Sequence, residues 1–226
     1  NPARLLLALG LLLALAASAG AATTDEQRLA ERFAPLLEVK EQQDPPCDTS
    51  GEQYIPSAVE IVLGRRNIVL RGPADDAGSP APTAADLFGK GAEWSLDYPG
   101  NPFDPGCTYA RDAIALGQGD PAVAYAHIVT QPDAPRQLAL QYWFFYYFNQ
   151  FNDLHEGDWE MIQLVFDAST AAEALDQEPV WVGYSQHDGG ERASWDDDKL
   201  EREGTHPVVY PAAGSHANYF SSELWL

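Results

Sequence analysis

Basic residues are scarce in this chain, and their scarcity limits what the protein can bind. The sequence holds 13 Lys and Arg against 34 Asp and Glu, for a formal net charge of −21. A phosphate backbone or an anionic membrane surface would repel such a protein at long range. We therefore exclude nucleic acid as a partner. A bound divalent cation would suit this charge, although a charge excess is more often a solubility feature of the surface.

Cysteine is almost absent, with only Cys47 and Cys107 in the sequence. In an exported protein, two cysteines most simply form one disulfide. The closed loop would hold about 60 residues, for which loop entropy predicts a stabilisation of roughly 4 kcal/mol. The alternative is a pair of free, buried thiols.

Methionine is absent before Met161, so the sequence lacks its own start residue, and we expect a fragment whose C-terminus is truncated as well. The chain opens with Arg4, an apolar run at 5–17 and then small residues. This three-part pattern predicts a secretory signal peptide at 1–21 and a secreted or extracytoplasmic location, without stable membrane insertion after cleavage. An uncleaved anchor is the rival interpretation, since residues 5–24 are uncharged and about long enough to cross a bilayer.

Internal repeats, coiled-coil heptads, phosphate loops and regular strand–helix alternation are also missing, which argues against a doubly wound sheet. Short apolar runs separated by Gly and Pro turns predict a single all-β domain over 22–226, most simply a two-sheet β-sandwich with one or two short peripheral helices. A capping box at Thr24 predicts one of those helices. Residues 59–63 and 68–70 suggest a hairpin, and residues 188–204 suggest a charged loop.

The most informative stretch is residues 141–166, which read QYWFFYYFNQFNDLHEGDWEMIQLVF. The first half places aromatic rings on both faces of an extended chain, as expected for a strand buried on both sides. In the second half, Asp158 and Glu160 share a face with apolar residues. Burying a lone carboxylate there costs several kcal/mol, so the two acids require a cation, a proton or a ring of donors.

His155 lies three residues before Asp158 and completes a candidate metal site of His155, Asp158 and Glu160. One imidazole with carboxylate oxygens suits Mg²⁺, Ca²⁺ or Mn²⁺ better than zinc, for which three histidines and one carboxylate would be typical. The alternative is that backbone N–H groups and Arg or Tyr side chains satisfy both carboxylates.

Further candidates for chemistry lie near strand ends or in predicted turns, where distant parts of a sandwich converge. They could serve as a base, a proton carrier or an extra ligand in a metal-dependent hydrolase, and they are Glu156, His187, His206 and His216. Ser185 and Ser215 adjoin histidines, but neither serine lies in a Gly-x-Ser-x-Gly elbow, so a serine hydrolase is not favoured.

Two blocks carry a family resemblance: YWFFY followed by HEGDWE (residues 155–160), and HPVVYPAAGSHANYF (residues 206–220). They resemble the vacuolar protein sorting-associated protein 62 family, for which no biochemical activity is settled. HEGDWE is also distantly similar to the Gly-His-Arg-His-Asp-Trp-Glu motif of necrosis-inducing toxins, which are metal-binding β-sandwiches that recognise membrane glycosphingolipids.

The toxin motif matches here at His155, Asp158, Trp159 and Glu160 and departs at Leu154, Glu156 and Gly157. The toxins' upstream acidic ligand has no clean counterpart, for which Asp153 or Asn149 would have to substitute. The resemblance thus implies metal binding more than toxicity.

From these observations we expect an exported metal-binding β-sandwich that recognises a polar ligand, such as a glycan or a lipid head group, at a His/Asp/Glu rim site. A metal-dependent hydrolase at the same site is the second hypothesis. A third is a purely structural role, in which the polar cluster joins two strands.

Overall fold

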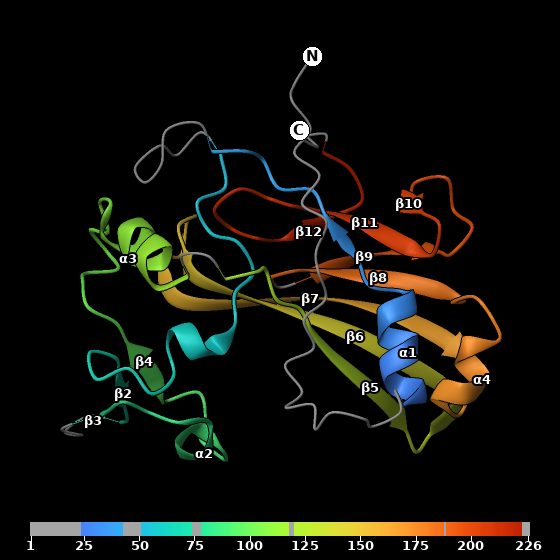
Figure 1. The fold of residues 1–226 in the computed structure, drawn as a ribbon, viewed down its shortest axis with the longest axis horizontal. Helices are drawn as coiled ribbons and strands as arrows, with labels where there is room; N and C mark the ends of the chain where they lie inside the picture. Colours follow the sequence, from blue (N-terminus) through green and yellow to red (C-terminus); the bar gives the residue numbers. More distant parts are fainter. Residues whose placement is uncertain (1–23, 43–50, 74–77, 118–119, 188, 223–226) are drawn as a thin grey trace.

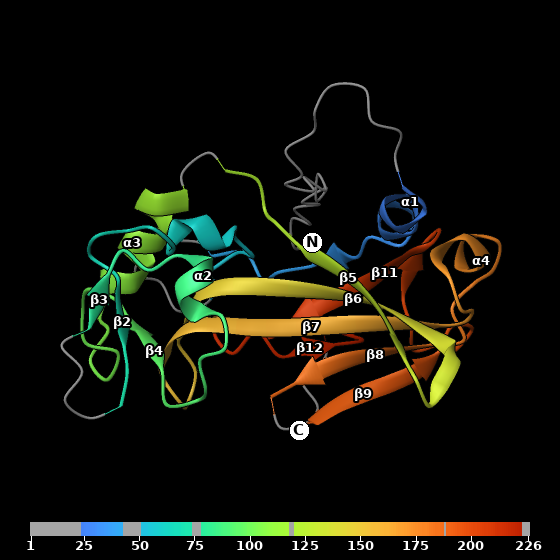
Figure 2. The ribbon, with the colours of Figure 1, turned by 90° about the horizontal axis from the view of Figure 1, so that it is seen from below.

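The computed structural model describes residues 24–42, 51–73, 78–117, 120–187 and 189–222. Its largest sheet has five strands, which run antiparallel in the order β5-β6-β7-β8-β9 (Figures 1 and 2). The strands are β5 (Tyr125–Gln131), β6 (Ala134–Asn149), β7 (His155–Asp167), β8 (Trp181–Gln186) and β9 (Gly189–Ser194). Sequence neighbours pair throughout, so the sheet is a simple meander.

The long β6–β7 hairpin forms the centre of this sheet. In its register, Tyr146 faces Asp158 and Phe144 faces Glu160. Every residue from Phe144 to Asn149 is buried, whereas Trp143 is only half-buried. The expected strand with two buried faces is therefore present, but only at the end of β6 where other elements cover both sides.

One face of the large sheet is covered by a second sheet and two helices. The second sheet joins β1 (Leu36–Leu37), β10 (Arg202–Glu203), β11 (His206–Pro211) and β12 (Asn218–Tyr219), with β1 parallel to β11 and the other pairs antiparallel. The buried Tyr184 of β8 donates its hydroxyl to the Val208 carbonyl at 2.8 Å, and its ring stacks on Phe220. These contacts tie the two layers together.

Helices α1 (Asp25–Arg32) and α4 (Ala171–Leu175) lie side by side at one end of the sheets (Figure 1). The capping box predicted at Thr24 begins α1. Phe33, just after α1, packs edge-on against Phe166 of β7, and the buried Tyr142 hydroxyl donates to the Ala30 carbonyl at 2.7 Å. The apolar side of α1 therefore completes the core between the layers.

A third, smaller sheet lies at the opposite end, in the order β3-β2-β4 (Figure 1). It consists of β2 (Val69–Arg71), β3 (Ser79–Pro80) and β4 (Ser95–Asp97), accompanied by the 3₁₀ helix η1 (Val59–Ile61), α2 (Ala84–Leu87) and α3 (Thr108–Gly117). Tyr109 of α3 stacks on Phe148 at 4.0 Å between ring centroids, and Tyr98 packs against Tyr147 at 4.8 Å. This unit buries the second face of β6.

The protein is thus mostly β, with few helices, as predicted from the sequence. The count of two sheets was too low, because the described residues form a third sheet from 69–97. Within the described residues, four α-helices replace the one or two expected, and the longest of these, α3, was missed. The hairpin expected at 59–63 and 68–70 was wrong, since 59–61 form a 3₁₀ helix, and the charged loop at 188–204 contains β9.

The predicted signal peptide at 1–21 lies outside the described residues, and so does Cys47, which leaves its pairing with Cys107 a prediction. Within the described ranges, no helix combines the length and the apolarity that a bilayer span requires.

Candidate functional site

Two carboxylates of β7 form the centre of the candidate site. Asp158 and Glu160 are only 7% and 3% exposed, and they lie on the face of β7 that turns toward the second sheet. The alternation of a regular strand places them there, as the sequence predicted. Their cross-strand neighbours are the fully buried rings of Tyr146 and Phe144, so solvent cannot satisfy most of their lone pairs.

Asp158 is paired with a buried histidine from the loop between β11 and β12. The Oδ2 atom of Asp158 lies 2.7 Å from Nδ1 of His216, whose side chain is fully buried. The His216 ring stacks on Tyr146 with 3.9 Å between centroids, and Nε2 lies 3.4 Å from Oε1 of Glu52. A buried Glu52–His216–Asp158 chain therefore links residue 52 to β7.

Glu160 is held by the neighbouring strand. The Ser185 hydroxyl of β8 donates to Oε2 of Glu160 and accepts a hydrogen bond from the Met161 N–H at 3.0 Å. The Oε1 atom of Glu160 lies 3.7 Å from Nδ1 of His187. Ser185 thus orients this carboxylate and leaves one of its oxygens facing His187.

Two partly exposed imidazoles stand beside the carboxylates. His155 places Nε2 3.5 Å from Oδ1 of Asp158, and its Nδ1 lies 2.6 Å from the Asp153 carbonyl. The side chains of His155 and His187 are 40% and 39% exposed. These two rings therefore form the solvent side of a cluster whose carboxylates are buried.

The backbone is unusual at two of these histidines. His187 and His216 adopt positive φ angles of 51° and 58°. Residues other than glycine rarely occupy this left-handed region, although histidine does so more often than most. Such conformations cost on the order of 1–3 kcal/mol and cluster at functional sites, where the surrounding structure enforces them.

The surroundings shift the protonation equilibria of the cluster in opposite directions. Burial raises the pKa of Glu160 to about 7, against the effect of the Ser185 hydrogen bond. Burial would also raise the pKa of Asp158, but hydrogen bonds with His155 and His216 outweigh it and hold that pKa at about 2. Burial lowers the pKa of His216, yet the Asp158 and Glu52 carboxylates prevail and raise it to about 9.

At neutral pH the cluster therefore pairs an ionised Asp158 with a charged His216, while Glu160 is close to half-protonated. The pKa of His155 is raised as well, chiefly by the hydrogen bond between its ring and the Asp158 carboxylate. A group that titrates near pH 7 at a partly open site can accept a proton or receive a cation.

Other sequence candidates lie elsewhere. The ring of His206 bonds the Ala34 carbonyl at 2.7 Å, and Glu156 accepts hydrogen bonds from the Tyr109 hydroxyl and the Tyr98 N–H at 2.5 and 3.1 Å. Of the two residues considered as substitutes for the upstream acid, the Asn149 side chain accepts a hydrogen bond from the Phe151 N–H, and the Asp153 backbone carbonyl contacts the His155 ring.

Sequence analysis missed Glu52 and Tyr146 as members of the cluster, and it considered Ser185 only as a nucleophile. Glu52 lies in a polar stretch with no motif, so only the tertiary structure reveals its burial beside His216. The alternation of β6 and β7 was the signal that placed Tyr146 on the same face as Asp158.

Among the described residues, no group of three His, Cys, Asp or Glu side chains is arranged to hold a metal ion. His155, Asp158 and Glu160 are near neighbours, but their polar atoms stand in two pairs, His155 with Asp158 and His187 with Glu160. The donor types still suit a hard divalent ion, because two carboxylates and an imidazole lie close together. A metal at this site is accordingly a proposal.

Comparison with known proteins gives similarity in fold only. No known family and no curated protein matches the sequence, so the resemblance to the vacuolar protein sorting-associated protein 62 family has no support. Among solved structures, one described as "Toxin fold for microbial attack and plant defense" matches with a TM-score of 0.50 and 17% identity, covering 88% of this chain and 70% of the other.

Two further matches are weaker. "NLPPya in complex with glucosamine" has a TM-score of 0.46 and 16% identity, over 88% of this chain and 68% of the other. "Necrosis and Ethylene inducing Protein 2" from the causal agent of cocoa's witches' broom disease has a TM-score of 0.36 and 19% identity, over 46% and 47% of the two chains. The chain is therefore similar in fold to the toxin of the first of these structures, in line with the distant resemblance of its motif to a toxin motif.

Proposed function

We propose that the protein is an exported binding protein that holds a divalent cation through His155, Asp158 and Glu160 and recognises a polar ligand there, a glycan or a lipid head group. One observation carries this proposal. Each of two nearly buried carboxylates has one oxygen fixed from behind and the other turned toward a partly exposed imidazole.

The fixed oxygens support this arrangement of ligands. His216 holds Oδ2 of Asp158 and Ser185 holds Oε2 of Glu160, so Oδ1 and Oε1 are the oxygens that face the two imidazoles. Hydrogen-bonded partners of this kind orient ligand carboxylates in metal sites. His187 is a fourth candidate ligand beside Glu160.

The ligand types favour Mg²⁺, Ca²⁺ or Mn²⁺ over zinc, since two carboxylates would provide oxygen atoms. A bound cation would supply positive charge and open coordination positions that hydroxyl or phosphate oxygens of a ligand can fill. Export is proposed from the N-terminal sequence pattern, which lies outside the described residues.

Metal content tests the cation. The mature domain is purified without chelator or affinity metal, and separate samples are soaked with Mg²⁺, Ca²⁺, Mn²⁺ or Zn²⁺. After desalting, the bound metal is measured by plasma mass spectrometry. We expect about one equivalent in the wild type and little in Asp158→Ala. Asp167→Ala is the matched control, because Asp167 lies on the same strand but pairs with Arg136 at the surface. Equal metal content in wild type and Asp158→Ala would refute the site.

Ligand binding tests the second half of the proposal. A glycan array and flotation with glycolipid-containing vesicles are run with the soaked cation and with chelator. We expect glycan or vesicle binding that appears only with the cation and that is lost in Asp158→Ala. Binding that survives the chelator would separate ligand recognition from the metal.

A metal-dependent hydrolase is the second candidate, favoured by the pKa of about 7 at Glu160 beside His187. Such a carboxylate can accept a proton at neutral pH. Turnover of a phosphoester, ester or glycoside that is lost in Glu160→Gln would favour the enzyme over the binding protein.

A further inference from the structure

The large sheet has an outer face, opposite to the side that carries Asp158 and Glu160. The second sheet, α1 and α4 cover the inner side. The unit of the third sheet covers the outer face near the end of β6, where Tyr98 packs against Tyr147. Farther along the strands, the outer-face side chains stay partly exposed, among them Gln141, Met161 and Gln163.

One end of this outer face carries a group of aromatic rings from three strands. Trp159 of β7 is 46% exposed. Its ring lies 5.2 to 6.4 Å, between centroids, from the rings of Phe145, Tyr125 and Trp143. These neighbours hold the Trp159 ring in place while part of its surface stays open, so a ligand that stacks on it does not have to immobilise a flexible side chain.

The other end of the outer face holds a cavity of about 290 Å³ beside Trp181 of β8. Trp181 pairs with Val165 of β7, which places both side chains on the outer face. The cavity also has polar walls, formed by Gln137, Arg136 and Asp167. Its volume is close to the lower limit of roughly 300 Å³ for small-molecule sites, which suits a single ring-shaped ligand group.

The strip between these two ends carries amides and no charge. Trp159 and Val165 are six residues apart along β7, so the two aromatic positions are separated by about 20 Å. Gln141 of β6, Gln163 of β7 and Gly183 of β8 lie side by side in between. Within the described ranges, the Gln163 side chain has no hydrogen-bond partner and is available to a ligand.

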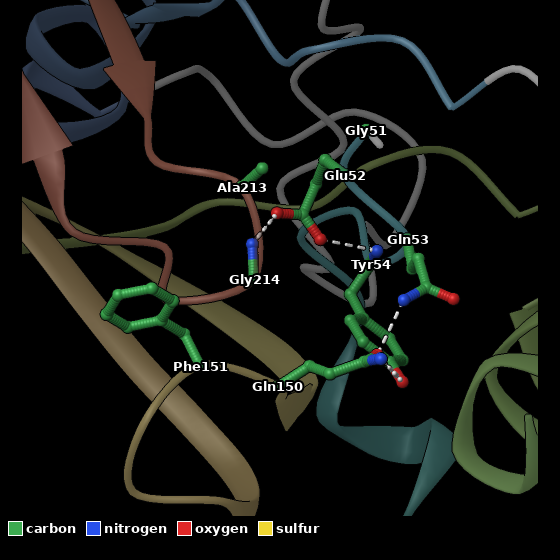
Figure 3. A pocket seen from close by; sticks show the side chains of 8 residues that line it. All are labelled: Gly51, Glu52, Gln53, Tyr54, Gln150, Phe151, Ala213 and Gly214. Carbon is green, nitrogen blue, oxygen red and sulfur yellow. Dashed lines mark hydrogen bonds between the residues drawn. The ribbon is translucent and has the colours of Figure 1, made fainter. Parts of the chain in front are cut away.

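A cavity of about 220 Å³ beside Glu52 differs from this arrangement (Figure 3). Both Glu52 oxygens already accept backbone hydrogen bonds, from the Tyr54 N–H at 2.7 Å and the Gly214 N–H at 2.8 Å. The neighbouring Gln53 and Gln150 side chains are paired with each other at 2.6 Å (Figure 3). That cavity is a junction of three chain segments whose polar groups are satisfied, so it offers little to a ligand.

The chemistry of the outer face matches a neutral sugar chain. A sugar ring has an apolar face of C–H groups and a rim of hydroxyls, which suit an aromatic ring and side-chain amides respectively. The net charge of −21 repels acidic polysaccharides, and the uncharged strip offers no partner to an ionic ligand. Two ring positions about 20 Å apart on one sheet face require an extended chain.

We propose that the outer face binds a neutral, extended glycan of the β-linked glucan type. One sugar ring stacks on Trp181 in the cavity and another on Trp159, and the hydroxyls between them bond to Gln141 and Gln163. This site uses no metal ion, so it goes beyond the rim site proposed above and does not depend on it.

Cellohexaose is the test ligand, because its β-linked chain is extended. Maltohexaose, which has the same sugar in a curved chain, and hexagalacturonate, which is anionic, are the comparisons. Binding is measured by isothermal titration calorimetry with chelator present. We expect saturable binding of cellohexaose, and binding of the other two at least about tenfold weaker, since the curved chain reaches only one ring position and the acidic chain is repelled.

Trp181→Ala and Trp159→Ala should each weaken cellohexaose binding by about fivefold or more through loss of a stacking surface. Trp94→Ala is the matched control, because Trp94 is a half-exposed tryptophan outside this face that contacts Lys90. Trp159→Ala keeps the test decisive if Trp181→Ala fails to fold. Unchanged binding in both variants, or equal affinity for cellohexaose and maltohexaose, would overturn the proposal.

Two further outcomes separate this face from other occupants. Cellohexaose binding that requires a divalent cation would belong to the rim and would overturn the outer-face site, whereas binding in chelator that is lost in Trp181→Ala supports it. A wild-type dimer that Trp181→Ala converts into a monomer, measured by light scattering, would assign the face to a second copy of the chain instead of a glycan.

Discussion

At the residue scale, Gly157 explains why this chain departs from the toxin motif. The motif's second histidine falls on Gly157, which has φ +70° and would place a Cβ atom 2.9 Å from the Tyr98 hydroxyl and 3.3 Å from the Phe145 ring. Any side chain at this position would therefore meet the Tyr98 hydroxyl at its Cβ atom. Local packing and the positive φ both favour glycine here.

This geometry predicts that Gly157→Ala destabilises the protein by about 2–3 kcal/mol, since it combines left-handed strain with overpacking. Gly204→Ala is the matched control, with φ +65° but nothing within 4 Å of its Cβ position, and it should cost only about 1–2 kcal/mol. Urea unfolding of both variants provides the comparison. Equal losses of unfolding free energy in the two variants would show that the Tyr98 side chain moves aside with no energetic penalty.

The pKa values of the cluster predict how stability depends on pH in the metal-free protein. The pKa of Glu160 rises from 4.5 to about 7 on folding, so its ionisation is disfavoured and stability is lost as pH rises through that window. The pKa of His216 rises from 6.5 to about 9, so its stabilisation is complete below 6.5 and lost toward 9. Asp158, lowered from 3.8 to about 2, stabilises above 3.8 and loses this effect as pH falls through 2.

Thermal unfolding in chelator should therefore show highest stability near pH 4–5. Between pH 4.5 and 7 the wild type should lose on the order of 2 kcal/mol more than Glu160→Gln. Glu178→Gln, an exposed glutamate, should follow the wild type. Parallel curves for wild type and Glu160→Gln would mean that Glu160 stays ionised and solvated.

At the element scale, the three sheets differ in how firmly they are held. β6 and β7 share a long register and bury residues such as Tyr142, Ile162 and Leu164 completely. The strands β2, β3 and β4 are two or three residues long, and both residues of β3 are exposed. We therefore expect local unfolding to begin in the small sheet.

Native-state hydrogen exchange checks this difference. Amides of Tyr142 and Ile162 should exchange only through global unfolding, whereas those paired between β2 and β4 should exchange through local opening. We expect protection at least about 100-fold lower in the small sheet. Uniform protection across the three sheets would instead describe a single cooperative unit.

At the scale of the whole molecule, the net charge of −21 opposes the compact state through self-repulsion. The exposed ion pairs Arg28–Asp25, Arg71–Asp97 and Arg136–Asp167 contribute little against it. Salt shortens the Debye length from about 30 Å at 0.01 M to about 10 Å at 0.1 M. Screening should therefore stabilise the fold overall.

We expect the unfolding temperature in chelator to rise by a few degrees, about 3–6 °C, when NaCl increases from 10 to 200 mM. Differential scanning calorimetry at pH 7 measures it, and choline chloride at equal ionic strength controls for specific sodium binding. A fall in the unfolding temperature would show that local ion pairs outweigh the overall repulsion.

The sequence alone determined the features that depend on local patterns. Strand alternation placed Asp158 and Glu160 on a buried face, the capping box began α1, and the HEGDWE block pointed to the toxin-like fold. Each of these signals arises from residues only a few positions apart, whose geometry is fixed by the backbone repeat.

Only the tertiary structure decided which distant groups meet those carboxylates. His216 reaches Asp158 from a distant loop, and Glu52 in turn contacts His216. Ser185 reaches Glu160 across the β7–β8 pair, whereas His206 faces Ala34. The third sheet likewise forms by pairing short segments that carry no strong alternation of their own. These contacts depend on how layers pack, and packing is a property of the whole chain that no local pattern encodes.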